Sequence, residues 1–119
     1  MAYDNENIFA KILRGEIPCD KIYEDKWVLA FNDIAPQAPV HVLVIPKGAY
    51  VSLDDFSAKA SDAEIAGLYR AVGKVARDLG LDEPGYRTLN NTGRDGGQEV
   101  PHFHVHIFGG GPLGPMLAR

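Results

Sequence analysis

Cysteine is almost absent from this chain, because Cys19 is the only one among 119 residues. A single thiol cannot form an internal disulfide or supply paired ligands for a structural zinc ion, which fits a protein of a reducing compartment. The sequence also lacks any apolar run long enough to cross a membrane, and its acidic start is unlike a signal peptide. We therefore expect a cytoplasmic protein with no membrane span.

An excess of basic residues is lacking as well. The formal net charge is -4, and no basic stretch occurs. Long nucleic acids need a positive surface that neutralises phosphates, so binding to them is not expected, whereas a local site for one nucleotide remains compatible with this charge. The length and the apolar content of 45% predict one globular domain over residues 1–119.

The most informative feature present is a set of three histidines at alternate positions in one short apolar run: His102, His104 and His106. On a β-strand, successive side chains point to opposite faces. The three imidazoles then share one face, and the apolar residues between them share the other, where they pack into the core. Core packing explains the apolar residues, but histidines on a solvent-facing strand surface require a chemical reason.

The spacing of the histidines favours one central nucleophile over a zinc site. Neighbouring members lie about 7 Å apart on a strand and the outer two about 13 Å apart, whereas zinc holds its nitrogen ligands at about 2.0–2.1 Å. A metal site would need two of the three and a further ligand such as His41. A nucleophilic site needs only His104 with a polar partner on each side.

A polar, glycine-rich loop over residues 91–98 precedes the histidine run. Glycines let backbone N–H groups converge on an anion, and Asn91 can add a side-chain donor, although a plain hairpin turn is the alternative. Free histidine has a pKa of about 6.5, so a neutral imidazole beside an anion cradle predicts phosphoryl or nucleotidyl transfer. The transfer would pass through a phosphorus–nitrogen bond that water then cleaves, and no metal is required.

Residue patterning predicts an α+β fold, with an antiparallel β-sheet of about five strands and two helices. Asn5 or Asn7 can cap the first helix, and Ser61 with Glu64 forms a capping box for the second. In the second helix, Gly67 and Gly73 suggest close packing on the sheet. Strands are expected at residues 21–24, 27–31, 41–45 and 86–90 and along the histidine run, with 41–45 central and covered on both faces.

The chain resembles the histidine triad (HIT) family, and within it the Hint branch. The family signature is His-φ-His-φ-His-φ-φ, with φ hydrophobic, and it matches residues 102–108. Further matching segments are Ile8-Phe9 with Ile17-Pro18, and residues 30–34, 36–41, 44–47 and 95–98. The resemblance implies a HIT-like sheet domain that joins its partner's sheet in a homodimer. It also implies hydrolysis of purine nucleoside phosphoramidates and related adenylates, such as aminoacyl-adenylates, to the nucleoside monophosphate.

The resemblance also assigns roles to individual positions. His104 takes the place of the nucleophile, His102 and His106 orient it and contact the phosphate, and no cofactor or metal is implied. His41 matches a fourth, supporting histidine, and Asp33 matches the acidic residue that binds the ribose hydroxyls. The other matched positions are the phosphate contacts Asn91, Gly97 and Val100, and the apolar walls around the base, Ile8, Phe9, Phe31 and Ile34.

Two positions and the C-terminal tail depart from the family pattern. Glu99 stands where familiar Hint proteins carry a serine that is thought to help the leaving group depart. A carboxyl group would change how the leaving group is handled, or would donate a proton if a phosphate raised its pKa. Pro101 replaces an aromatic residue, and the tail lacks the C-terminal tryptophan found in some relatives.

Three other interpretations stay open beside hydrolysis through His104. One is a nucleotide-binding or partner-binding module with marginal catalysis. Another is a metal-dependent hydrolase that uses His41 with two of the triad histidines. The third is a dinucleoside polyphosphate hydrolase.

Overall fold

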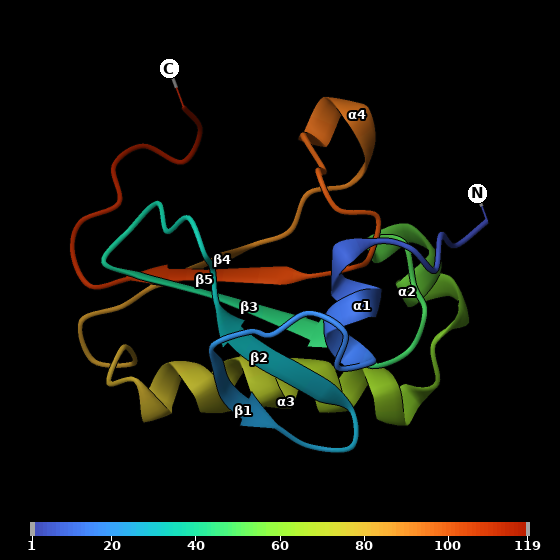
Figure 1. Cartoon of the computed structure of the whole chain (residues 1–119). Helices are drawn as coiled ribbons and strands as arrows, with labels where there is room; N and C mark the ends of the chain where they lie inside the picture. The colour runs from blue at the N-terminus through green and yellow to red at the C-terminus, as the bar shows by residue number, and fades with distance from the viewer. Residues whose placement is uncertain (1, 119) are drawn as a thin grey trace.

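A five-stranded antiparallel sheet forms the centre of the fold in the computed structural model, which describes residues 2–118 (Figure 1). Its order is β1-β2-β3-β5-β4, and every neighbouring pair is antiparallel. The strands are β1 (Lys21–Glu24), β2 (Val28–Asn32), β3 (Val40–Pro46), β4 (Arg87–Leu89) and β5 (Val105–Gly109). The helices are α1 (Ile8–Leu13), α2 (Leu53–Lys59), α3 (Asp62–Asp78) and α4 (Gly93–Gly96). The predicted α+β class is confirmed.

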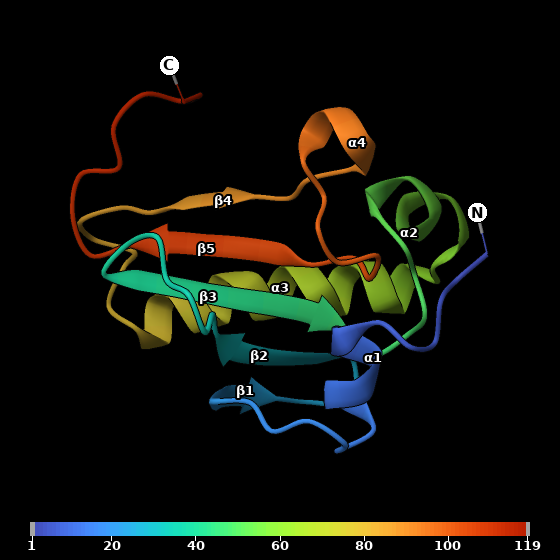
Figure 2. The same cartoon turned by 45° about the horizontal axis from the view of Figure 1, so that its top comes forward.

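The long helix α3 covers one face of the sheet (Figures 1 and 2). It begins at the predicted capping box, in which the Ser61 side chain accepts from the Glu64 backbone and the Glu64 side chain accepts from the Ser61 backbone. Its apolar stripe packs on side chains that alternate along β2, β3 and β5 and the residues before β5. These are Val28, Ala30, Val42, Val44, Phe103, Val105 and Ile107.

The opposite face of the sheet carries α1, which Asn7 caps by accepting from the Ala10 backbone N–H. Phe9 of α1 packs there with Leu29, Phe31, Leu43 and Ile45. Strand β3 is therefore central and buried from both sides, as its continuous apolar sequence predicts. The face under α1 is the one that carries the histidines.

Two helices were missed by the sequence patterning, so the expected count of two helices is wrong. Helix α2 begins at a second capping box, formed by Ser52 and Asp55, but it is short and buries only Phe56. Helix α4 forms within residues 91–98, where a loop was expected, and it projects from the sheet in Figure 1. Among the helices that the structure describes, none has the length and apolar content that crossing a bilayer requires.

Gly67 of α3 lies against the ring of Trp27, and this contact leads to a stability prediction. A β-carbon at residue 67 would stand 2.5 Å from Trp27 Cγ and Cδ1. We expect Gly67→Ala to lower the free energy of unfolding by about 1–3 kcal/mol, because overpacking outweighs the better helix propensity of alanine. Urea unfolding followed by the fluorescence of Trp27, the only tryptophan, measures this change.

Gly73 of the same helix provides the matched control. A β-carbon there would meet only the flexible end of the Arg77 side chain, at 3.2 Å from Nη1. We expect Gly73→Ala to be neutral or to stabilise by up to about 1 kcal/mol. Equal effects of the two alanine variants would show that the contact with Trp27 is not the reason why alanine at residue 67 destabilises the fold.

Candidate active site

The three histidines lie on one side of the chain, but they are not all in a strand. Strand β5 begins only at Val105, so His102 and His104 precede it. The ring centroid of His104 lies 5.0 Å from that of His106 and 5.0 Å from that of Phe9. The expectation of a solvent-facing row is wrong for two members, since His102 is 0% and His104 7% exposed. The N-terminal segment and α1 cover them.

His102 is held by hydrogen bonds at both ring nitrogens. Nε2 lies 2.9 Å from the carbonyl oxygen of Pro46, which can only accept, so Nε2 carries the proton. Nδ1 then accepts from the hydroxyl of Tyr3. Burial lowers the pKa of His102 to about 4, which keeps the ring neutral at physiological pH. The next residue, Phe103, is fixed by its backbone N–H, which donates to the Tyr50 carbonyl at 2.7 Å.

His104 is oriented by the backbone of His102. Its Nδ1 donates to the His102 carbonyl oxygen at 2.7 Å, so the neutral ring keeps its lone pair on Nε2. Within residues 2–118, Nε2 has no hydrogen-bond partner. No fully buried side-chain nitrogen or oxygen in this range lacks a partner, so Nε2 retains some exposure to solvent. Burial lowers the pKa of His104, against smaller opposing effects of the His102 carbonyl, Asp33 and Glu99. The arrangement presents an unprotonated ring nitrogen that can attack phosphorus.

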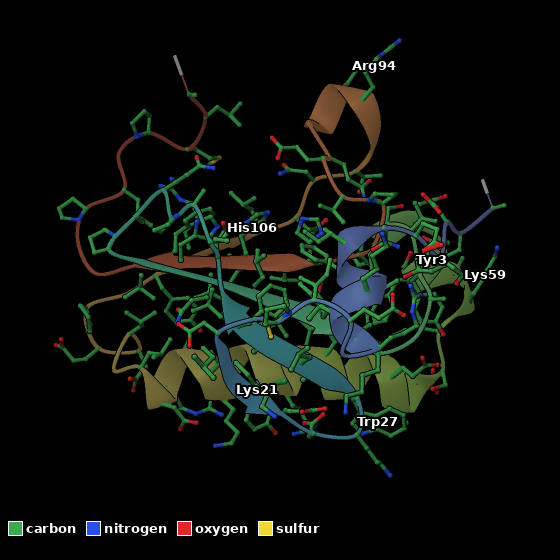
Figure 3. The ribbon with its side chains drawn as sticks, in the orientation of Figure 1. Tyr3, Lys21, Trp27, Lys59, Arg94 and His106 are labelled. Atoms are coloured by element: carbon green, nitrogen blue, oxygen red, sulfur yellow. The ribbon has the colours of Figure 1, made fainter. Side chains whose placement is uncertain are left out.

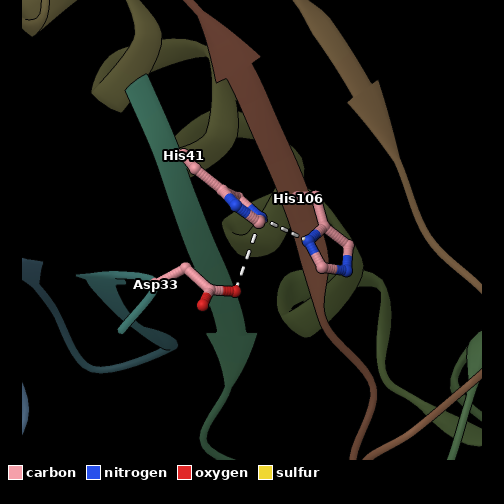
Figure 4. Close-up of side chains that lie close together, drawn as sticks. All are labelled: Asp33, His41 and His106. Carbon is pink, nitrogen blue, oxygen red and sulfur yellow. Dashed lines mark hydrogen bonds and ion pairs between the residues drawn. The ribbon is translucent and has the colours of Figure 1, made fainter. Parts of the chain in front are cut away.

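His106 belongs to a chain of three side chains from two paired strands and a loop (Figure 4). The backbone N–H of Gln37 donates to His41 Nδ1 at 3.1 Å, so His41 Nε2 carries the proton. That proton lies between His106 Nδ1, at 2.9 Å, and Asp33 Oδ2, at 3.4 Å. His106 Nδ1 therefore accepts, and its own proton is on Nε2. Burial lowers the pKa of His41, and burial and the neighbouring imidazoles lower that of His106 to about 4.

Asp33, His41 and His106 also form a set of groups that could bind a metal, since their ligand atoms lie within 4.8 Å of one another. One carboxylate and two imidazoles suit zinc. Two nitrogens on a tetrahedral zinc stand about 3.3 Å apart with both lone pairs on the ion, whereas His41 Nε2 points at His106 Nδ1. The groups as they lie make a hydrogen-bonded chain. It contains one triad histidine, not the two that the metal-dependent interpretation expected.

A cavity of about 660 Å³ opens beside α1, and its lining includes Phe31 of β2 and Leu43 of β3, which are paired in the sheet. This volume suits a nucleoside-sized ligand. Seven of the predicted binding residues line it: Ile8, Phe9, Phe31, Asp33, Ile34, Glu99 and Val100. Among the described residues that line it there are three carboxylates and no lysine or arginine.

Some predicted positions differ from their expected surroundings. Ile34 is fully exposed and Ile8 is 46% exposed, so they stand at the rim of the cavity and not in an enclosed wall. Asn91 and Gly97 are not among the described residues that line the cavity. Gly97 instead ends α4 with a φ of 76°, a left-handed conformation that favours glycine.

Three groups that orient the histidines were missed by the sequence analysis. They are the hydroxyl of Tyr3, the carbonyl of Pro46 and the backbone N–H of Gln37. Two of them are backbone groups, which leave no signature in residue identity. Tyr3 lies 99 positions from its partner, and no local pattern connects the two.

Comparisons with known proteins identify the family of this chain. A model of the HIT domain matches residues 14–113. The purine nucleoside phosphoramidase of Escherichia coli K12 is 50% identical over 114 residues, which are 96% of this chain and 95% of that protein. A HIT-like protein of Azospirillum brasilense is 65% identical, over 98% of this chain and 96% of its own.

Solved structures share the architecture over nearly the full length. A HIT family hydrolase from Clostridium thermocellum superposes with a TM-score of 0.88 at 39% identity, covering 97% of this chain and 99% of its own. A histidine triad protein from Clostridium difficile gives a TM-score of 0.85 at 44% identity, covering 98% of this chain and 100% of its own. The chain belongs to the HIT domain family.

Proposed function

We propose that this protein hydrolyses purine nucleoside phosphoramidates and related adenylates to the nucleoside monophosphate, through a covalent nucleotidyl intermediate on His104. The observation that carries the proposal is the free Nε2 of His104, whose Nδ1 is held by the His102 carbonyl. The ring contacts Phe9, which lines the cavity. A relative that is 50% identical is named a purine nucleoside phosphoramidase.

The first step forms a bond between His104 Nε2 and phosphorus, and breaks the bond from phosphorus to the leaving group. The ring becomes positively charged, and the Nδ1–H bond to the His102 carbonyl stabilises that charge. The leaving amine departs with a proton. Glu99 lines the cavity and can supply it when protonated.

The second step returns His104 to its starting state. Water attacks phosphorus, its proton passes to the Glu99 carboxylate and the phosphorus–nitrogen bond breaks, which leaves the nucleoside monophosphate and a neutral ring. His106, whose Nε2–H is set by the His41 hydrogen bond, can donate to a phosphate oxygen in both steps. Its place 5.0 Å from the His104 ring suits this role.

The nucleoside half of the substrate would occupy the cavity. The Asp33 carboxylate can accept both hydroxyls of a ribose diol, and the rings of Phe9 and Phe31 offer apolar surfaces to a purine. Asn91, Gly97 and Val100 remain the proposed phosphate contacts from family resemblance. Of these, Val100 is the one that lines the cavity.

The charge of the cavity favours a phosphoramidate over a dinucleoside polyphosphate. Asp20, Asp33 and Glu99 line it, and no cationic side chain does so among the described residues. Each further phosphate charge within about 4 Å of a carboxylate adds about 1 kcal/mol of repulsion even in water. A leaving group with little negative charge avoids this repulsion.

We also propose that residues 1–119 form one HIT-like domain that pairs as a homodimer in the cytoplasm. The sheet ends in two edge strands, β1 and β4, and joining two copies along an edge would satisfy its unpaired backbone groups. The single thiol suits a reducing compartment. Sedimentation velocity of the assayed sample tests the pairing, and a monomer at assay concentration would contradict it.

The test of function is hydrolysis of adenosine 5′-phosphoramidate in the presence and absence of EDTA. We expect steady turnover that the chelator does not change, and at least about tenfold slower hydrolysis of a diadenosine polyphosphate because of the repulsion described above. Loss of activity in EDTA would instead favour a metal at Asp33, His41 and His106. Tight AMP binding without turnover would favour a binding module.

A further inference from the structure

We propose that Tyr3 is a positioning residue for the reaction at His104, acting through the hydrogen bond from its hydroxyl to the ring of His102. The inference deepens the proposed function and depends on it. Tyr3 lies outside the segments that match the family signature. Figure 3 shows it near the N-terminal end of the chain, on the side of the molecule where α1 and α2 lie.

The hydroxyl of Tyr3 is a donor in this contact. His102 Nε2 must carry the ring proton, because it faces the carbonyl of Pro46. The other nitrogen, Nδ1, is therefore an acceptor, and Tyr3 is its partner in the described chain. The two rings also meet edge to face, with centroids 5.6 Å apart and planes at 72°. The ring of His102 is thus restrained at both nitrogens and along its edge.

The restraint on His102 reaches His104 because His102 is hydrogen-bonded both to Tyr3 and to His104. The ring of His102 accepts from Tyr3, and the carbonyl of His102 accepts from His104 Nδ1. That second bond selects the tautomer with a free Nε2. His102 is completely buried, so loss of the Tyr3 hydroxyl leaves an acceptor without a partner in an apolar setting. The ring can then reorient or exchange its proton, and the direction of its carbonyl becomes less defined.

Local sequence places Tyr3 where it can act. The carbonyl of Asp4 accepts from both the backbone and the side-chain nitrogen of Asn7, which itself caps α1. The segment before α1 is therefore fixed to the helix. Phe9 of this helix packs edge-on against His104, at 5.0 Å between centroids. One short stretch of chain thus contacts two of the three histidines.

The experiment replaces Tyr3 by phenylalanine, which removes the hydroxyl and keeps the ring. We expect kcat for adenosine phosphoramidate to fall about 3- to 10-fold, the equivalent of one hydrogen bond. KM should stay within about twofold, because Tyr3 does not line the cavity. Tyr69→Phe is the matched control, since Tyr69 is 52% exposed on α3, across the sheet, and its variant should match the wild type.

A spectroscopic readout separates positioning from general destabilisation. In ¹⁵N-labelled protein, the ring signals of His102 should report a proton on Nε2 and a hydrogen-bonded Nδ1. Tyr3→Phe should move the Nδ1 signal and should leave the His41 ring unchanged. Unchanged kcat, or a reduced kcat with unmoved His102 signals, would overturn the proposal.

If the wild type does not hydrolyse phosphoramidates, the proposed function fails, and the catalytic role of Tyr3 fails with it. An active wild type with a normal Tyr3→Phe variant refutes the role of Tyr3 alone.

Discussion

His104→Ala is expected to hydrolyse adenosine phosphoramidate at least about 10³-fold more slowly than the wild type. The substitution removes the ring nitrogen that is free to bond to phosphorus, while His102 and His106 keep their own restraints. His102 has both nitrogens engaged, and His106 carries its proton on Nε2, so neither presents an equivalent lone pair. Steady-state turnover measures the loss.

Two controls make this result specific. AMP binding to His104→Ala, measured by titration calorimetry, should stay within a few-fold of wild type, because the ribose and base contacts remain. Acid quenching of the wild type during turnover should trap a nucleotidyl adduct on His104 that mass spectrometry can locate. Near-normal turnover of the alanine variant, or an adduct on another residue, would refute the assignment of the nucleophile.

Hydrogen bonds determine which ring nitrogen carries the proton in each of the four histidines. Each ring has a proton whose position is set by a group that can only accept or only donate: the Pro46 carbonyl for His102, the His102 carbonyl for His104 and the Gln37 N–H for His41. His106 receives its tautomer from His41. Backbone groups thus fix the tautomers of these neutral rings, and the rings need not change their charge before the substrate binds.

Alternation along residues 102–107 predicted which side chains share a face. The apolar residues of the run pack under α3, and the histidines lie on the opposite side, as the two-residue period of extended chain requires. The alternation continues before β5 begins, where Phe103 is buried in the core under α3 and its backbone N–H donates to the Tyr50 carbonyl. This is why the face was predicted correctly although the strand boundary was not.

Burial of the histidines could not be predicted from the run itself. It depends on Phe9 and Tyr3, which are about a hundred positions away and arrive through the folding of α1 onto the sheet. Helix α2 was missed for a different reason. Its Ser52 and Asp55 form the same capping pattern as Ser61 and Glu64, but only Phe56 is buried and the helix has no apolar stripe to reveal its period.

The buried neutral histidines also predict a strong loss of stability in acid. The pKa of His102 is about 4 in the folded chain against an ordinary value of 6.5, so between these values the unfolded chain binds a proton that the folded chain does not. The contribution of His102 to stability is complete above pH 6.5 and is lost as the pH falls toward 4. For His102 alone it amounts to about 3 kcal/mol. His106, with a pKa of about 4, acts in the same direction.

His102→Gln isolates this effect, because an amide can donate to the Pro46 carbonyl and accept from Tyr3 without titrating between pH 4 and 7. Urea unfolding at a series of pH values, followed by Trp27 fluorescence, gives the free energy of unfolding of both proteins. Carboxylate titration contributes to both curves and cancels in their difference. The wild-type free energy of unfolding should fall relative to that of the variant by about 3 kcal/mol between pH 6.5 and 4. Parallel curves would mean that His102 is protonated inside the fold, and its Nδ1 could then not accept from the Tyr3 hydroxyl at low pH.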